Sequence, residues 1–135
     1  MKTDAVYARQ SVEKKDSLSI AGQIDLCRRT ADGGELRVYK DAGYSGKNTE
    51  RPAFQQLMKD IRADRIGTLY VYRLDRFSRS VADFGQLWEV LQEHQVEFVS
   101  VNENFDTKTP MGRAMLHIIM VFAQLERETT AERVR

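Results

Sequence analysis

Short β-prone segments alternate with helical segments along most of this chain, and this alternation limits the fold more than any other feature. Valine, tyrosine and phenylalanine concentrate in residues 4–10, 36–40, 66–72 and 96–101, which predicts four strands. The order β-α-β-α-β-α-β favours a three-layer α/β fold, with a mainly parallel sheet of four to five strands and helices on both faces. We expect the strand order 2-1-3-4, with a ligand site where the first and third strands end.

Capping signals indicate where the intervening helices begin. Ser17 or Ser19 is suited to cap a helix that runs to about Thr30, and Pro52 suits the first position of the next helix. Ser80, followed three residues later by Asp83, resembles a capping box. These signals support the alternation read from the apolar pattern.

Composition excludes several classes of protein. With 135 residues, 41% hydrophobic and 30% charged, the chain is expected to form one globular domain. The single cysteine, Cys27, allows no internal disulfide and fits a reducing cytoplasm. Lys2 and Asp4 lead directly into the first strand and no long apolar run follows, so we expect neither a signal peptide nor a membrane span. The net charge of +1 argues against binding of nucleic acid by bulk charge.

Arginines gather where the third predicted strand ends. Arg73, Arg76 and Arg79 lie within seven residues, together with Asp75. The planar guanidinium group stays charged and binds phosphate through two parallel hydrogen bonds. A solvated turn with surface ion pairs is the commoner outcome for such a cluster. The position of the cluster in the fold favours phosphate recognition.

Ser11 follows the first predicted strand, so the topology brings it to the same sheet edge as the arginines. The chain offers no histidine at a strand end to form a Ser-His-Asp triad, and no cluster of zinc ligands. A serine among arginines remains, and such a cluster stabilises charge that develops on a phosphoryl group. Asp75 would either carry a proton or orient an arginine. The arginines in question are Arg9, Arg51, Arg73, Arg76 and Arg79.

The last predicted helix opens at Thr109-Pro110 and is apolar on nearly every side between Ala114 and Leu125. A helix docked on one sheet face needs only one apolar stripe, so residues from Met111 to Phe122 are expected to contact a partner as well. The segment ends in charged residues without a glycine or proline stop, from which we expect a longer protein.

The motifs together resemble those of the serine recombinases, the resolvase/invertase family. Tyr7-Ala8-Arg9-Gln10-Ser11 is similar to the family's nucleophile motif, and residues 73–79 are similar to its catalytic Asp-Arg-x-x-Arg segment. The long segment between the first strand and the first helix looks most like the large serine recombinases and the transposon recombinases. Further matches are Gln23 in the first helix, Asp41, Ser45 and Arg51 in the family's mobile loop, and Glu126 and Arg127 late in its long dimerisation helix.

The resemblance implies a resolvase-like fold and a DNA strand-exchange activity. Ser11 would attack a DNA phosphodiester and form a 5′-phosphoserine link, with no cofactor and no metal ion. A homodimer would assemble into a synaptic homotetramer on its recombination sites. Residues 1–108 would form the catalytic core, and residues 109–135 would begin the oligomerisation helix that leads to a DNA-binding region outside this chain. Site residues implied by the family are Ser11, Arg9, Asp75, Arg76, Arg79 and Arg51, supported by Tyr7, Gln23, Asp41, Ser45 and Arg73.

Two alternatives remain at this stage. A metal-dependent nuclease or phosphatase would use Asp41 and Asp75 as ligands, but it would not need five arginines. A non-enzymatic receiver-like or assembly domain would share the fold and dimerise through its last helix, but it leaves Arg9 and Ser11 unexplained.

Overall fold

The computed structural model describes residues 2–10, 19–31, 35–42, 52–78 and 81–133. Within this part of the chain, five strands form one sheet in the order β2-β1-β3-β4-β5. β1 (Thr3–Gln10), β2 (Leu36–Ala42), β3 (Ile66–Val71) and β4 (Glu97–Ser100) run parallel, and the two-residue β5 (Phe105–Asp106) is antiparallel to β4. The predicted order 2-1-3-4 is therefore confirmed, and the fifth strand is a short edge strand.

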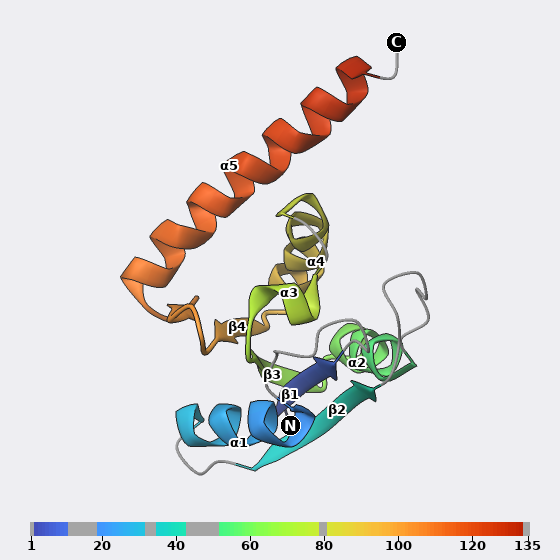
Figure 1. Ribbon diagram of the computed structural model, residues 1–135, viewed down its shortest axis with the longest axis vertical. Helices are drawn as coiled ribbons and strands as arrows, with labels where there is room; N and C mark the ends of the chain where they lie inside the picture. The colour runs from blue at the N-terminus through green and yellow to red at the C-terminus, as the bar shows by residue number, and fades with distance from the viewer. Residues whose placement is uncertain (1, 11–18, 32–34, 43–51, 79–80, 134–135) are drawn as a thin grey trace.

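Helices cover both faces of the sheet (Figure 1). α1 (Ile20–Thr30) packs on one face, where Cys27 meets Val6, Tyr70 and Val99. α2 (Pro52–Arg62), α3 (Leu74–Phe77), α4 (Val81–Glu93) and α5 (Pro110–Arg133) contribute to the larger core on the other face. Successive side chains along a strand alternate between the two faces: Val6 of β1 packs with α1, and the next residue, Tyr7, packs with α2.

Phenylalanine rings form the centre of the larger core. Phe77 from α3 contacts Phe54, Phe84 and Phe98 at centroid distances of 5.7, 6.4 and 5.3 Å. Phe98 of β4 also contacts Phe105 of β5 at 6.0 Å, so the ring cluster joins three helices to β4 and β5. Aromatic pairs in such edge-to-face and tilted geometries stabilise a core beyond the area that they bury.

The helix starts follow the predicted caps where the structure describes them. Ser19, rather than Ser17, caps α1, and its Oγ accepts a hydrogen bond of 3.1 Å from the Gly22 amide. Thr109 caps α5, and its Oγ1 accepts from the Gly112 amide at 3.0 Å. Ser80 lies outside the described residues. The one-turn helix α3 was not predicted, because the sequence at Arg73–Phe77 carries no capping signal.

α5 extends well beyond the sheet, and its C-terminal end lies away from the rest of the domain (Figure 1). Its 24 residues correspond to about 36 Å at 1.5 Å per residue. Leu116 and Ile119 pack on the larger core and Ala123 is fully buried. The exposed apolar residues lie on the opposite side of the helix from Ala123, and each is at least half exposed: Met111, Ile118, Val121, Phe122 and Leu125.

Candidate active site at the carboxyl edge of the sheet

Gln23 holds the end of β1, the strand that precedes Ser11. Its side chain is fully buried, its Oε1 accepts from the Arg9 amide at 3.3 Å, and its Nε2 donates to the Arg9 carbonyl at 3.1 Å. These are the two backbone groups that a neighbouring strand would bind, and the pairing of β1 with β3 ends at Tyr7 and Val71. A side chain of α1 therefore takes over from β3 at the point where β3 turns away.

Asp41 joins β1, β2 and α2. It lies directly opposite Arg9 in the β1–β2 register and is almost completely buried. The Tyr7 hydroxyl donates to its Oδ2 at 2.8 Å, and the amides of Ala53 and Phe54 donate to its carboxylate at 3.0 and 3.1 Å. Asp41 is thus a remote cap for α2, which has no acidic residue in its own first turn.

The contacts of Asp41 also tie β2, which precedes residues 43–51, to α2, which follows them. Residues 43–51, which include the predicted site residues Ser45 and Arg51, lie outside the described part of the chain. The strand before this segment and the helix after it are tied to one carboxylate. Sequence reasoning singled out Asp41 by resemblance but missed this capping role, which the lack of a Ser, Thr, Asp or Asn directly before Pro52 could have indicated.

α3 carries two of the predicted site residues, Asp75 and Arg76, and lies against β1. The backbone of both residues is helical, while their side chains fall outside the described part of the structure. Arg73 precedes the helix in an extended conformation and is exposed. Ser11 and Arg79 are also outside the described residues, so their predicted roles stay predictions.

Glu126 and Arg127, the two residues predicted late in the last helix, lie on α5 and not with the residues at the carboxyl edge of the sheet. Glu126 is exposed on α5, sixteen residues after Pro110, which corresponds to about 24 Å along the helix. Arg127 follows in the same helix, and its side chain is not described. Among the described residues, the structure therefore brings together Tyr7, Arg9, Gln23, Asp41 and the α3 segment.

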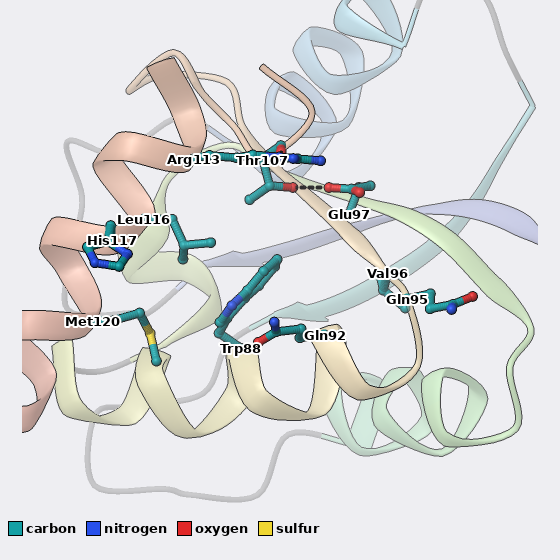
Figure 2. A pocket seen from close by; sticks show the side chains of 10 residues that line it. All are labelled: Trp88, Gln92, Gln95, Val96, Glu97, Thr107, Arg113, Leu116, His117 and Met120. Atoms are coloured by element: carbon teal, nitrogen blue, oxygen red, sulfur yellow. Dashed lines mark hydrogen bonds between the residues drawn. The ribbon is translucent and has the colours of Figure 1, made fainter. Parts of the chain in front are cut away.

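A cavity of about 660 Å³ lies elsewhere, between α4 and α5 (Figure 2). Trp88 projects into it from α4, and Leu116 and Met120 line it from α5 (Figure 2). Polar side chains line the rest of it: Arg113 of α5 donates to the Thr107 carbonyl at 3.1 Å, and the Thr107 hydroxyl donates to Glu97 of β4 at 2.5 Å. None of the predicted site residues lines this cavity.

Two groups with raised pKa values lie away from the sheet edge that holds the candidate site. Burial raises the pKa of the Cys27 thiol to about 12. Burial, together with the hydrogen bond that its hydroxyl donates to Asp60, raises the pKa of Tyr39 to about 12. Asp60 is itself buried on α2. Its carboxylate also accepts hydrogen bonds from the Gln56 side chain at 3.1 Å and from the exposed Arg37 side chain at 3.4 Å. This cluster fastens α2 to β2 and has a structural role.

Comparison with known proteins identifies the family. Residues 5–135 match the family described as "Resolvase, N terminal domain", and the chain belongs to this family. The chain is 40% identical over 103 residues to a DNA-invertase of Enterobacteria phage P7, which covers 76% of this chain and 53% of the invertase. It is 34% identical over 127 residues to the transposon Tn917 resolvase of Enterococcus faecalis, covering 94% of this chain and 64% of that protein. The chain thus spans about half the length of the phage P7 invertase.

Solved structures agree with this assignment. The N-terminal catalytic domain of TP901-1 integrase superposes with a TM-score of 0.82 at 38% identity, covering 96% of this chain and 99% of that one. A resolvase family site-specific recombinase from Streptococcus pneumoniae gives a TM-score of 0.81 at 25% identity, covering 99% and 93%. The resolvase-like fold expected from the sequence is therefore confirmed. None of the helices in the described part of the chain combines the length and the apolarity that a bilayer crossing requires.

Proposed function

We propose that this chain is the catalytic domain of a site-specific DNA recombinase in which Ser11 attacks the DNA backbone. The observation that carries the proposal is the convergence at the carboxyl edge of the sheet. Gln23 and Asp41 fix the strand that leads to Ser11, and the segment with Asp75 and Arg76 lies against that strand. Family membership supports the same reading, because its relatives are named DNA-invertase, resolvase and integrase.

The proposed chemistry is a transesterification. The Ser11 oxygen forms a bond to phosphorus, the bond from phosphorus to the 3′-oxygen breaks, and the 3′-oxygen leaves as a hydroxyl group after it gains a proton. One phosphoester replaces another, so a 3′-hydroxyl from a different strand reverses the step without ATP. Asp75 either carries the proton or orients a guanidinium group. The charge on the phosphoryl oxygens would be neutralised by Arg9, Arg51, Arg76 and Arg79.

We propose that the active assembly is a homodimer that pairs into a synaptic homotetramer on DNA, in the cytoplasm. The apolar residues Ile118, Val121, Phe122 and Leu125 support a contact between α5 helices, because they lie together on the side that faces away from the core. A self-complementary stripe of this kind favours a twofold arrangement. In this proposal residues 1–108 are the catalytic core, residues 109–135 begin the oligomerisation helix, and DNA sequence is recognised by a region outside the chain.

The metal-dependent nuclease fits the described residues less well. It needs Asp41 as a ligand, yet both oxygens of that carboxylate accept hydrogen bonds from Tyr7, Ala53 and Phe54. These three hydrogen bonds occupy most of the acceptor positions of the buried carboxylate, which leaves little room for a catalytic ion. The recombinase proposal uses Asp41 in the role that its contacts support, which is to hold β1, β2 and α2 in place.

The test uses the complete gene product that contains this chain and a plasmid carrying the DNA that flanks its gene. Ser11→Ala is expected to abolish strand cleavage while electrophoretic mobility shift shows DNA binding unchanged. The matched control Ser17→Ala is expected to cleave like the parent protein. Cleavage is also expected to survive excess EDTA, because arginines neutralise the phosphoryl charge. Cleavage by the Ser11→Ala protein, or EDTA inhibition that Mg²⁺ reverses, would contradict the proposal.

Association is tested separately on α5. Phe122→Asp puts a charge into the exposed apolar stripe and is expected to shift the protein to monomers in sedimentation velocity. Gln124→Asp adds a similar charge on an exposed flank of the same helix and is expected to leave association unchanged. If the parent protein sediments as a monomer at high concentration, or if both variants behave alike, the stripe is not the interface.

A further inference from the structure

We propose that Glu103, in the turn between β4 and β5, is a positioning residue for the cleavage reaction because it holds the first turn of α3 in place. Its Oε1 accepts a hydrogen bond of 2.9 Å from the Leu74 amide, the first residue of that helix. The inference rests on the proposed function, because that function assigns catalytic roles to Asp75 and Arg76, which α3 carries.

α3 cannot hold its own position. It has four residues, whereas isolated helices shorter than about 12 residues are marginal in water. Arg73 occupies the capping position in an extended conformation, and its side chain makes no capping hydrogen bond. The orientation of the helix must therefore come from contacts with other parts of the fold.

The structure provides one anchor at each end of α3. At the C-terminal end Phe77 is fully buried and packs among Phe54, Phe84 and Phe98. At the N-terminal end the Glu103 carboxylate binds an amide that would otherwise lack an intrahelical partner. Asp75 and Arg76 lie between the two anchors, so a loosened anchor would move both residues relative to β1.

The Glu103 carboxylate is itself fixed by β4. The hydroxyl of Ser100, a fully buried residue at the end of that strand, donates to the same Oε1. The turn that follows is bound to the β3 end, because the Val101 amide donates to the Val71 carbonyl at 2.9 Å and the Asn102 amide donates to the Tyr72 carbonyl at 2.9 Å. Glu103 is exposed to solvent, so its contacts with Ser100 and Leu74, rather than burial, define its position.

The same stretch of chain also leads into α5. Two residues after Glu103 the chain enters β5, and the Asp106 carbonyl then accepts hydrogen bonds from the Thr109 amide and hydroxyl at 3.1 and 2.9 Å. The start of α5 therefore has its own set of contacts, independent of Glu103. We expect variants of Glu103 to change cleavage without changing association.

The test measures single-turnover formation of the covalent protein–DNA adduct by the complete gene product, on the plasmid described above and at saturating protein. Glu103→Ala is expected to slow adduct formation by about tenfold to a hundredfold, the scale of a small misplacement of catalytic groups. Glu103→Gln keeps an oxygen that accepts from the Leu74 amide, so it is expected to recover most of the parent rate. Glu89→Ala removes an exposed carboxylate on α4 and serves as the matched control.

DNA affinity, sedimentation and melting temperature are measured on the same proteins. The inference is overturned if Glu103→Ala forms adduct at the parent rate, or if Glu103→Gln is as slow as Glu103→Ala. Ser100→Ala removes the hydroxyl that orients the Glu103 carboxylate, and it serves as a second test if Glu103→Ala fails to fold. If the Ser100→Ala protein forms adduct at the rate of the parent protein, the inference is also overturned. If the parent protein itself forms no adduct on Ser11, the proposed function fails instead.

Discussion

Gln23→Leu tests whether one side chain substitutes for a strand at the end of β1. Leucine has a similar size but offers no hydrogen bond, so the Arg9 amide and carbonyl lose the partner that Gln23 provides. An unsatisfied buried backbone group costs about 1–3 kcal/mol, and Arg9 is only half-buried, which favours the lower half of that range. Two such groups give a loss of about 2–4 kcal/mol in the free energy of unfolding.

The assay is urea unfolding of the chain, followed by the fluorescence of its single tryptophan, Trp88, and by circular dichroism. With a urea m-value of about 2 kcal/mol per molar, the midpoint of Gln23→Leu is expected to fall by about 1–2 M. Gln23→Ala also leaves a cavity and is expected to fall further. Gln86→Leu, an exposed position on α4, is the matched control and is expected to change stability by less than about 0.5 kcal/mol. An unchanged midpoint in Gln23→Leu, with unchanged hydrogen exchange of the Arg9 amide, would refute the reasoning.

Three further expectations concern other parts of the fold. Tyr7→Phe removes one of the donors to the buried Asp41 carboxylate and is expected to cost about 1–3 kcal/mol in chemical denaturation, whereas Tyr72→Phe, at a half-buried position, should cost less. In Gly112→Ala the new Cβ would lie 1.7 Å from the Asp106 carbonyl oxygen, so the start of α5 must shift, and the midpoint of thermal unfolding should drop. The raised pKa of about 12 keeps the Cys27 thiol neutral in the folded protein, whereas the thiol of the unfolded chain ionises above about pH 9, so the free energy of unfolding should fall as pH rises above about 9. At pH 8 the thiol should react with Ellman's reagent only after unfolding.

Local chemistry made most of the fold predictable. The period of the apolar residues predicted the four parallel strands and every helix except α3. Capping signals located three helix starts: Thr109 and Pro52 directly, and Ser19 as one of two candidates. The order 2-1-3-4 was expected from the pattern of flavodoxin-like sheets, and the four parallel strands have this order. The limits of the helices and strands depend on neighbours in sequence, which is why they could be predicted.

Contacts between distant residues were not predictable in the same way. The cap on α2 comes from Asp41, eleven residues before Pro52, and the cap on α3 comes from Glu103, 29 residues after Leu74. Neither carboxylate follows a local pattern that predicts its partner. The side of α5 that faces away from the core was also undetermined, because the helix is apolar on several sides, and the structure assigns that side to Ile118 and Phe122 rather than to Leu116.

The residue that becomes linked to DNA tests the proposed role of Ser11 most directly. The adduct formed by the complete gene product is denatured, digested with nuclease and trypsin, and analysed by mass spectrometry. Cleavage after Arg9 and Lys14 releases the peptide Gln10–Lys14, in which Ser11 is the only hydroxyl-bearing residue. If Ser11 is the nucleophile, this peptide carries the nucleotide through a phosphoserine bond. A nucleotide on the peptide Asp41–Lys47, which contains Ser45, or on any other peptide, would contradict it.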